Sequence, residues 1–226
     1  MVRNKLWFSA LLCLIFTSIW LILMIISAAK TGPINSFEQA IVSVMNAGNF
    51  FQLNYINAVL ITIATTIFLV CLYDYCKSLN AQWSLIGFVF VPIYSIMNMF
   101  VYFSQITIIP RLLTLMKISA NPDIYTAILG QFVQGWSGSA IAVTNQLAYA
   151  ILGIPSIIFG GLLIKDKRVS TLGGWLLALN GVSCIIGIIG TVANSEILAV
   201  GSVIGGALFL FSLVAIVVNM RFVKLK

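Results

Sequence analysis

Residues 83–109 read WSLIGFVFVPIYSIMNMFVYFSQITII and contain no Asp, Glu, Lys or Arg. A helix needs about 20 apolar residues to cross the hydrocarbon core of a bilayer, so this stretch is long enough to span one. At about 100° per residue, its polar side chains fall on one helical face. They are Tyr94, Asn98, Tyr102 and Gln105. Because a polar face is unfavourable against lipid, we expect it to face other helices or a cavity.

The whole chain is divided into long stretches without charged residues. Including the stretch that contains residues 83–109, they are 6–29, 39–73, 78–110, 124–164, 169–195 and 197–220. Only 8% of the residues are charged, compared with about 25% in ordinary soluble domains. Runs such as LLCLIFTSIWLILMII at 11–26 lack the alternation of polar and apolar residues that a membrane β-barrel needs. The spans are therefore expected to be helical.

These stretches predict an all-α integral membrane protein in which residues 1–226 form a single domain, a six-transmembrane-helix bundle. The predicted spans are 6–29, 53–76, 83–109, 139–164, 171–193 and 197–220. The first span follows two basic residues and so imitates a secretory signal. Its apolar run is longer than the about 7–15 residues of a signal peptide, which favours a transmembrane helix.

The basic residues predict the orientation of the spans. With the N-terminus inside, the inner side carries Arg3, Lys5, Lys77, Lys165, Lys167, Arg168, Arg221, Lys224 and Lys226, and the outer side carries Lys30, Arg111 and Lys117. This distribution follows the positive-inside rule, so both termini are predicted to be cytoplasmic and the protein to lie in the cell membrane. A seventh span within 124–164 would reverse the bias.

The net charge of +7 does not indicate nucleic-acid binding. A nucleic-acid footprint needs basic residues clustered on one face, whereas here they lie at the ends of spans. We expect them to set the topology and to contact anionic lipid headgroups, so the bilayer is the expected partner.

Short amphipathic helices are predicted in the first and third connections, which lie outside. Ser36 and Gln39 have the spacing of a capping box that opens a helix over residues 37–46. Asn121-Pro122-Asp123 combines an N-cap residue, a first-turn proline and an acid, and predicts a second helix that ends near Val133.

Prolines are expected to interrupt the spanning helices. Pro110 is predicted to end the third span, with a separate interfacial helix over residues 111–117. Gly153-Ile154-Pro155 predicts an interruption of the fourth span, and Pro92 a weak point in the third at the same depth. Helices broken at matching depth are where transporters tend to place substrate sites.

The fourth span carries a second polar face, which includes Asn145 and Tyr149. Measured from the inner ends, Asn98 lies as deep as Tyr149, and Tyr102 as deep as Asn145. This match suggests a ligand cavity between spans three and four. Its lining would be Tyr94, Asn98, Tyr102, Gln105, Asn145 and Tyr149, with Arg111 attracting an anionic headgroup or substrate at the outer mouth. The alternative is that the stripes only join helices and that Arg111 extends to the interface.

The sequence contains no catalytic or metal-binding constellation, so no metal and no cofactor are expected. It has no histidine, and no acid lies within a predicted membrane core, which disfavours proton-coupled pumping. Without a nucleophile and base pair, an enzyme is also disfavoured. Cys13 and Cys184 are expected to be packing residues, and Cys71 and Cys76 have no second pair with which to bind a metal.

Spans five and six carry small residues at helical spacing, including Gly173, Gly187, Gly201 and Gly205. Such faces let helix backbones approach closely, either within the chain or in a homo-oligomer or a complex with a partner membrane protein. The leading functional hypothesis is binding or transport of a small neutral or amphiphilic molecule, a lipid included. The alternative is a non-catalytic structural or regulatory subunit that packs through these glycine faces.

Overall fold

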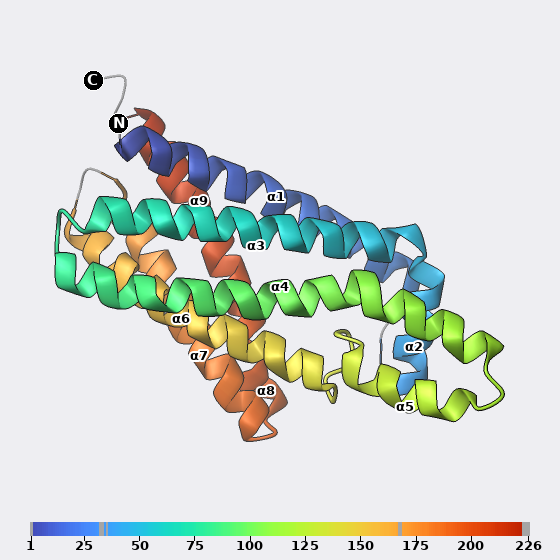
Figure 1. Ribbon diagram of the computed structural model, residues 1–226. Helices are drawn as coiled ribbons and strands as arrows, with labels where there is room; N and C mark the ends of the chain where they lie inside the picture. Colours follow the sequence, from blue (N-terminus) through green and yellow to red (C-terminus); the bar gives the residue numbers. More distant parts are fainter. Residues whose placement is uncertain (1, 32–33, 35, 167–168, 223–226) are drawn as a thin grey trace. The chain divides into compact units, whose positions relative to one another are not determined.

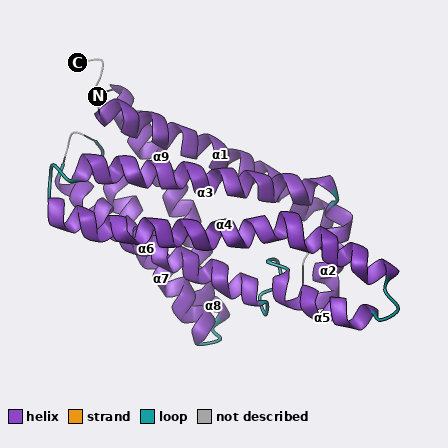
Figure 2. Cartoon of the chain, in the orientation of Figure 1, coloured by secondary structure: helices purple, strands orange, loops and turns teal. Residues whose placement is uncertain are grey.

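The computed structural model describes residues 2–31, 34, 36–166 and 169–222 of the chain. The chain is 89% helical, and the described residues contain no strand (Figures 1 and 2). In chain order the helices are α1 (Val2–Thr31), α2 (Phe37–Ala47), α3 (Asn49–Cys76), α4 (Ala81–Ile118), α5 (Pro122–Phe132), α6 (Ala140–Lys165), α7 (Thr171–Val192), α8 (Glu196–Ala199) and α9 (Gly201–Phe222).

Six described helical segments are long and apolar enough to cross a membrane, which confirms the predicted all-α class with six such helices. They are Val2–Ser27, Asn49–Cys76, Ala81–Ile118, Ala140–Lys165, Thr171–Val192 and Glu196–Arg221. Large apolar side chains such as Phe8, Ile96 and Val203 are exposed on these helices. Lipid is the environment in which such surfaces are stable.

The chain divides into two compact units. Unit 1 comprises Met1–Thr17, Ile61–Ile96 and Gln146–Lys226, and unit 2 comprises Ser18–Leu60 and Met97–Asn145. The helices α7, α8 and α9 belong wholly to unit 1, whereas α2 and α5 belong wholly to unit 2.

Glycines bring the helices of unit 1 into close contact, and α7 packs against both α6 and α9 (Figure 1). Toward α9, a Cβ on Gly187 would lie 2.1 Å from the Ser202 hydroxyl oxygen, and one on Gly205 would lie 2.6 Å from Cys184 Sγ. Gly201 and Gly173 are equally crowded, the latter by Ile216. These small residues therefore face neighbouring helices of the same chain.

The contact between α6 and α7 is also close, and here backbone meets backbone. A Cβ on Gly181 would lie 2.3 Å from the Gly153 carbonyl oxygen, and a Cβ on Gly153 would lie 2.6 Å from the Gly181 carbonyl oxygen. Gly160 and Gly174 meet in the same way two turns further along. Only hydrogen side chains permit backbones to approach to this distance.

Unit 2 has a core in which α2 and α5 pack against the C-terminal part of α4. Its buried residues are Ala40, Ile109, Leu112, Leu129 and Val133. The rings of Phe37 and Trp136 flank it with their centroids 6.1 Å apart. The short helices thus contribute an apolar face to this core.

The predicted end of the third span at Pro110 and the predicted interruption at Gly153-Ile154-Pro155 are wrong. The helix α4 continues through Pro92 and Pro110 to Ile118, and α6 continues through Pro155 from Ala140 to Lys165. No separate helix therefore begins after Pro110. Buried packing on both sides of Pro110, by Ile109 and Leu112, holds the backbone helical, and the close contact of Gly153 with α7 does the same beside Pro155.

The ends of the short helices follow the sequence with one exception. The Ser36 hydroxyl accepts a hydrogen bond from the Gln39 backbone at 3.2 Å, and Gly48 ends α2 with a φ of 52°. Asn121 is the N-cap residue of α5, as predicted, but its side chain makes no capping hydrogen bond. A proline at the first helical position already sets the backbone dihedral, so α5 begins without that hydrogen bond.

Candidate functional site

The predicted polar residues of unit 2 surround a small buried cluster formed by α3, α4 and α6. Its buried members are Tyr55, Ala58, Val101, Tyr102 and Ile141. The rings of Tyr55 and Tyr102 have centroids 6.2 Å apart, and the ring of Phe51 lies 4.7 Å from that of Tyr55. The cluster fixes which turns of α4 and α6 face each other, because Val101 and Tyr102 pack with Ile141.

Asn98 and Asn145 lie one helical turn away from this cluster, on the same side of it. Asn98 precedes Tyr102 by one turn on α4, and Asn145 follows Ile141 by one turn on α6. Because α4 and α6 run in opposite directions (Figure 1), these two steps lead to the same level of the helix pair. The fold of unit 2 therefore places two asparagines at matching depth on facing helices.

Both asparagine side chains are buried, with exposed fractions of 1% for Asn98 and 8% for Asn145. Neither Oδ1 atom has a hydrogen-bond partner among the described residues. A buried acceptor without a partner costs about 1–3 kcal/mol, and most buried polar groups in proteins avoid this cost. Each of these oxygens could accept a hydrogen bond that the described residues do not supply.

Gln105, by contrast, uses both ends of its amide to hold the chain that follows α5. Its Nε2 donates to the Phe132 carbonyl oxygen at 2.8 Å, and its Oε1 accepts from the Gln134 backbone at 3.1 Å. The Gln134 side chain in turn accepts from the Tyr55 hydroxyl at 2.6 Å. Gln105 therefore positions the segment between α5 and α6.

The other predicted lining residues are distributed between the two units. Tyr102 is buried in unit 2, where it packs in the cluster described above. Tyr94 is buried and Tyr149 is half-buried, and both belong to unit 1. Arg111 is exposed on α4. The structure thus brings Asn98, Tyr102, Gln105 and Asn145 together within one unit.

Sequence reasoning missed a buried acid in unit 1. Asp166, directly after α6, is 7% exposed and accepts a hydrogen bond from the Tyr75 hydroxyl at 2.6 Å. In the sequence it lies beside Lys165 in a charged turn, a pattern that is typical of an exposed residue. No feature of the sequence indicated that Asp166 is buried; only the fold shows it.

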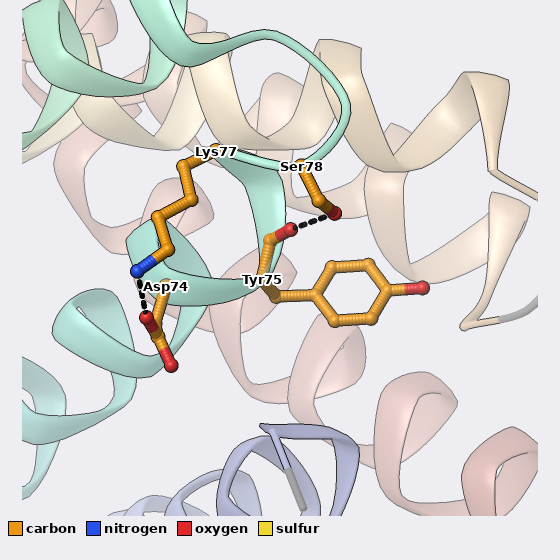
Figure 3. A network of polar contacts seen from close by, with 4 residues as sticks. All are labelled: Asp74, Tyr75, Lys77 and Ser78. Carbon is orange, nitrogen blue, oxygen red and sulfur yellow. Dashed lines mark hydrogen bonds and ion pairs between the residues drawn. The ribbon is translucent and has the colours of Figure 1, made fainter.

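The end of α3 beside Tyr75 is held by local polar contacts (Figure 3). The Ser78 hydroxyl donates to the Tyr75 carbonyl oxygen at 2.8 Å, and the Lys77 ammonium donates to the Asp74 carboxylate. The hydrogen bond to Asp74 raises the pKa of Lys77. These contacts close the turn between α3 and α4.

The four cysteines are unpaired. Cys13 Sγ lies 3.3 Å from Thr65 Oγ1, and Cys184 Sγ accepts from Asn180 at 3.5 Å. Within the described ranges, no group of three or more histidines, cysteines or acids could hold a metal ion.

No protein-family model matches this chain, no curated protein matches its sequence, and no solved structure matches its fold. Its class therefore follows from the fold alone. Six helices with the length and composition of membrane spans indicate a multi-pass membrane protein.

Proposed function

We propose that the chain binds a small neutral or amphiphilic molecule, such as a lipid, through Asn98 and Asn145. The observation that carries this proposal is the pair of buried, unpartnered Oδ1 atoms at one level of α4 and α6. An amide oxygen only accepts hydrogen bonds, so the ligand would supply hydroxyl or amide N–H groups. The charged residues of unit 2 all lie outside the predicted membrane core, which favours a neutral polar group at this level.

The proposed topology places both termini in the cytoplasm and α2 and α5 on the external side of the cell membrane. It is supported by the excess of basic residues at the inner ends of the spans. The alternative function, a structural subunit that packs through its glycines, has less support. Gly187 of α7 is already crowded by Ser202 of α9, and Gly205 of α9 by Cys184 of α7, all within the same chain.

Native mass spectrometry of the protein in mild detergent tests the binding site. The wild type is expected to retain a small molecule of defined mass. Asn98→Leu and Asn145→Leu should each lose it, because leucine has a similar shape and no acceptor, while the thermal unfolding of both variants stays cooperative.

Asn54→Leu is the matched control, because the Oδ1 of Asn54 is also buried without a partner but lies on α3. It should retain the ligand. A wild type that carries no bound molecule, or an Asn98→Leu variant that still carries it, would contradict the proposed function.

A further inference from the structure

Unit 2 contains an open cavity of about 310 Å³ that is separate from the asparagine pair. The end of α2, the first turn of α3 and the C-terminal part of α4 line it. Its lining residues are Val44, Met45, Gly48, Asn49, Phe51, Gln52, Ile109, Pro110, Leu113 and Lys117. Ligand sites usually measure about 300–1,000 Å³, so this cavity has room for part of a single chain and not for a whole two-chain lipid.

The walls combine an apolar surface with one cation. Six of the lining residues named above are apolar side chains, from Val44 to Leu113, and Lys117 is the charged residue among them. Among the described residues, the Lys117 ammonium makes no ion pair or hydrogen bond. It is therefore available to an anion that enters the cavity from the open side.

The electrostatic surroundings also favour an anion. Lys30 lies 3.8 Å from the ring centroid of Phe50, which is adjacent in sequence to the lining residues Asn49 and Phe51. The acid of α2, Glu38, lies in the first turn of that helix, at the end opposite to the cavity.

We infer that this cavity binds a fatty acid, with its alkyl chain against the apolar walls and its carboxylate at Lys117. A single ammonium matches a single carboxylate, and the volume matches part of one alkyl chain. The inference does not depend on the proposed function, because neither Asn98 nor Asn145 lines the cavity.

A photoactivatable fatty acid that carries a diazirine on a saturated 16-carbon chain tests this inference on the purified full-length protein. After irradiation, the labelled peptides should come from residues 44–52 and 109–117. Lys117→Gln should lower this labelling about tenfold, the size of effect expected when one charge-assisted contact is lost. Met45→Trp, which fills the cavity from an exposed position, should also block it.

Arg111→Gln is the matched control, because Arg111 is exposed on the same helix and does not line the cavity. It should label like the wild type, and the corresponding fatty alcohol should label these peptides poorly. Equal losses in Lys117→Gln and Arg111→Gln would mean general attraction to surface charge and would overturn the inference. Labelling that survives Met45→Trp, or that falls elsewhere in the chain, would overturn it as well.

Discussion

At the residue scale, the amide side chains of unit 2 have different roles despite their shared chemistry. Gln105 satisfies both ends of its amide on the backbone of residues 132–134, whereas Asn98 and Asn145 leave their oxygens unpartnered. Sequence periodicity predicted that these residues avoid lipid, and they are buried. Helical periodicity predicts only that a residue faces inward. It therefore does not distinguish Gln105, whose amide is hydrogen-bonded, from Asn98 and Asn145, whose oxygens have no partner among the described residues.

The acid in the first turn of α2 gives a pH-dependent prediction. Hydrogen bonds from its own backbone and from Ser36 lower the pKa of Glu38 below 4.5. Because the folded pKa is lowered, the carboxylate stabilises α2 above pH 4.5, and this contribution is lost as the pH falls through the lower folded pKa. Ser36→Ala removes one donor and should raise the pKa of Glu38.

A carbon-13 NMR titration of the labelled Glu38 carboxyl in detergent micelles measures this pKa. Ser43→Ala on the same helix is the control and should leave the Glu38 titration unchanged. A Ser36→Ala variant that titrates like the wild type would show that the hydroxyl does not contact the carboxylate.

At the element scale, close packing of helices decides whether a helix continues through a proline, which local sequence rules do not settle. A proline within a helix ordinarily breaks or kinks it, yet α4 and α6 continue through Pro110 and Pro155. Close tertiary packing beside each proline, by Leu112 in α4 and by Gly153 in α6, holds the backbone helical although one backbone donor is missing. The contact between α6 and α7 requires glycine at these positions, because the two backbones touch there.

Two glycine-to-alanine changes separate helix propensity from packing. Gly181→Ala places a methyl group 2.3 Å from the Gly153 carbonyl oxygen, so it should destabilise the protein by about 1–3 kcal/mol through overpacking. Gly161→Ala, on α6, meets nothing within 4 Å and should be neutral or stabilising by up to about 1 kcal/mol.

Thermal unfolding in detergent compares these two variants with the wild type. A lower midpoint for Gly181→Ala and an equal or higher midpoint for Gly161→Ala are expected. If both variants shifted in the same direction, the contact between α6 and α7 would not have the closeness that the structure gives it.

At the scale of the whole molecule, six apolar helices define a membrane protein, and the basic residues at their ends supply the proposed orientation. Gln82, at the start of α4, is expected inside, and Ala120, between α4 and α5, is expected outside. Both residues are exposed, so a cysteine at either position can react with an aqueous reagent.

A membrane-impermeant maleimide applied to sealed cells checks this orientation. Ala120→Cys should react before the membrane is opened, and Gln82→Cys only afterwards. The wild type serves as the blank, because Cys13, Cys76 and Cys184 are buried and Cys71 is partly buried. The reverse order of labelling would invert the proposed topology.

The sequence by itself determined the number and type of the membrane-spanning elements. Backbone groups in lipid must be hydrogen-bonded within their own segment, so a charge-free stretch of sufficient length is helical whatever surrounds it. Only the tertiary structure decided that α4 continues past Pro110, that Asp166 is buried, and that Gln105 is occupied while Asn98 and Asn145 are not. Each of these outcomes depends on a neighbour distant in the sequence, and no local periodicity records which helices become neighbours.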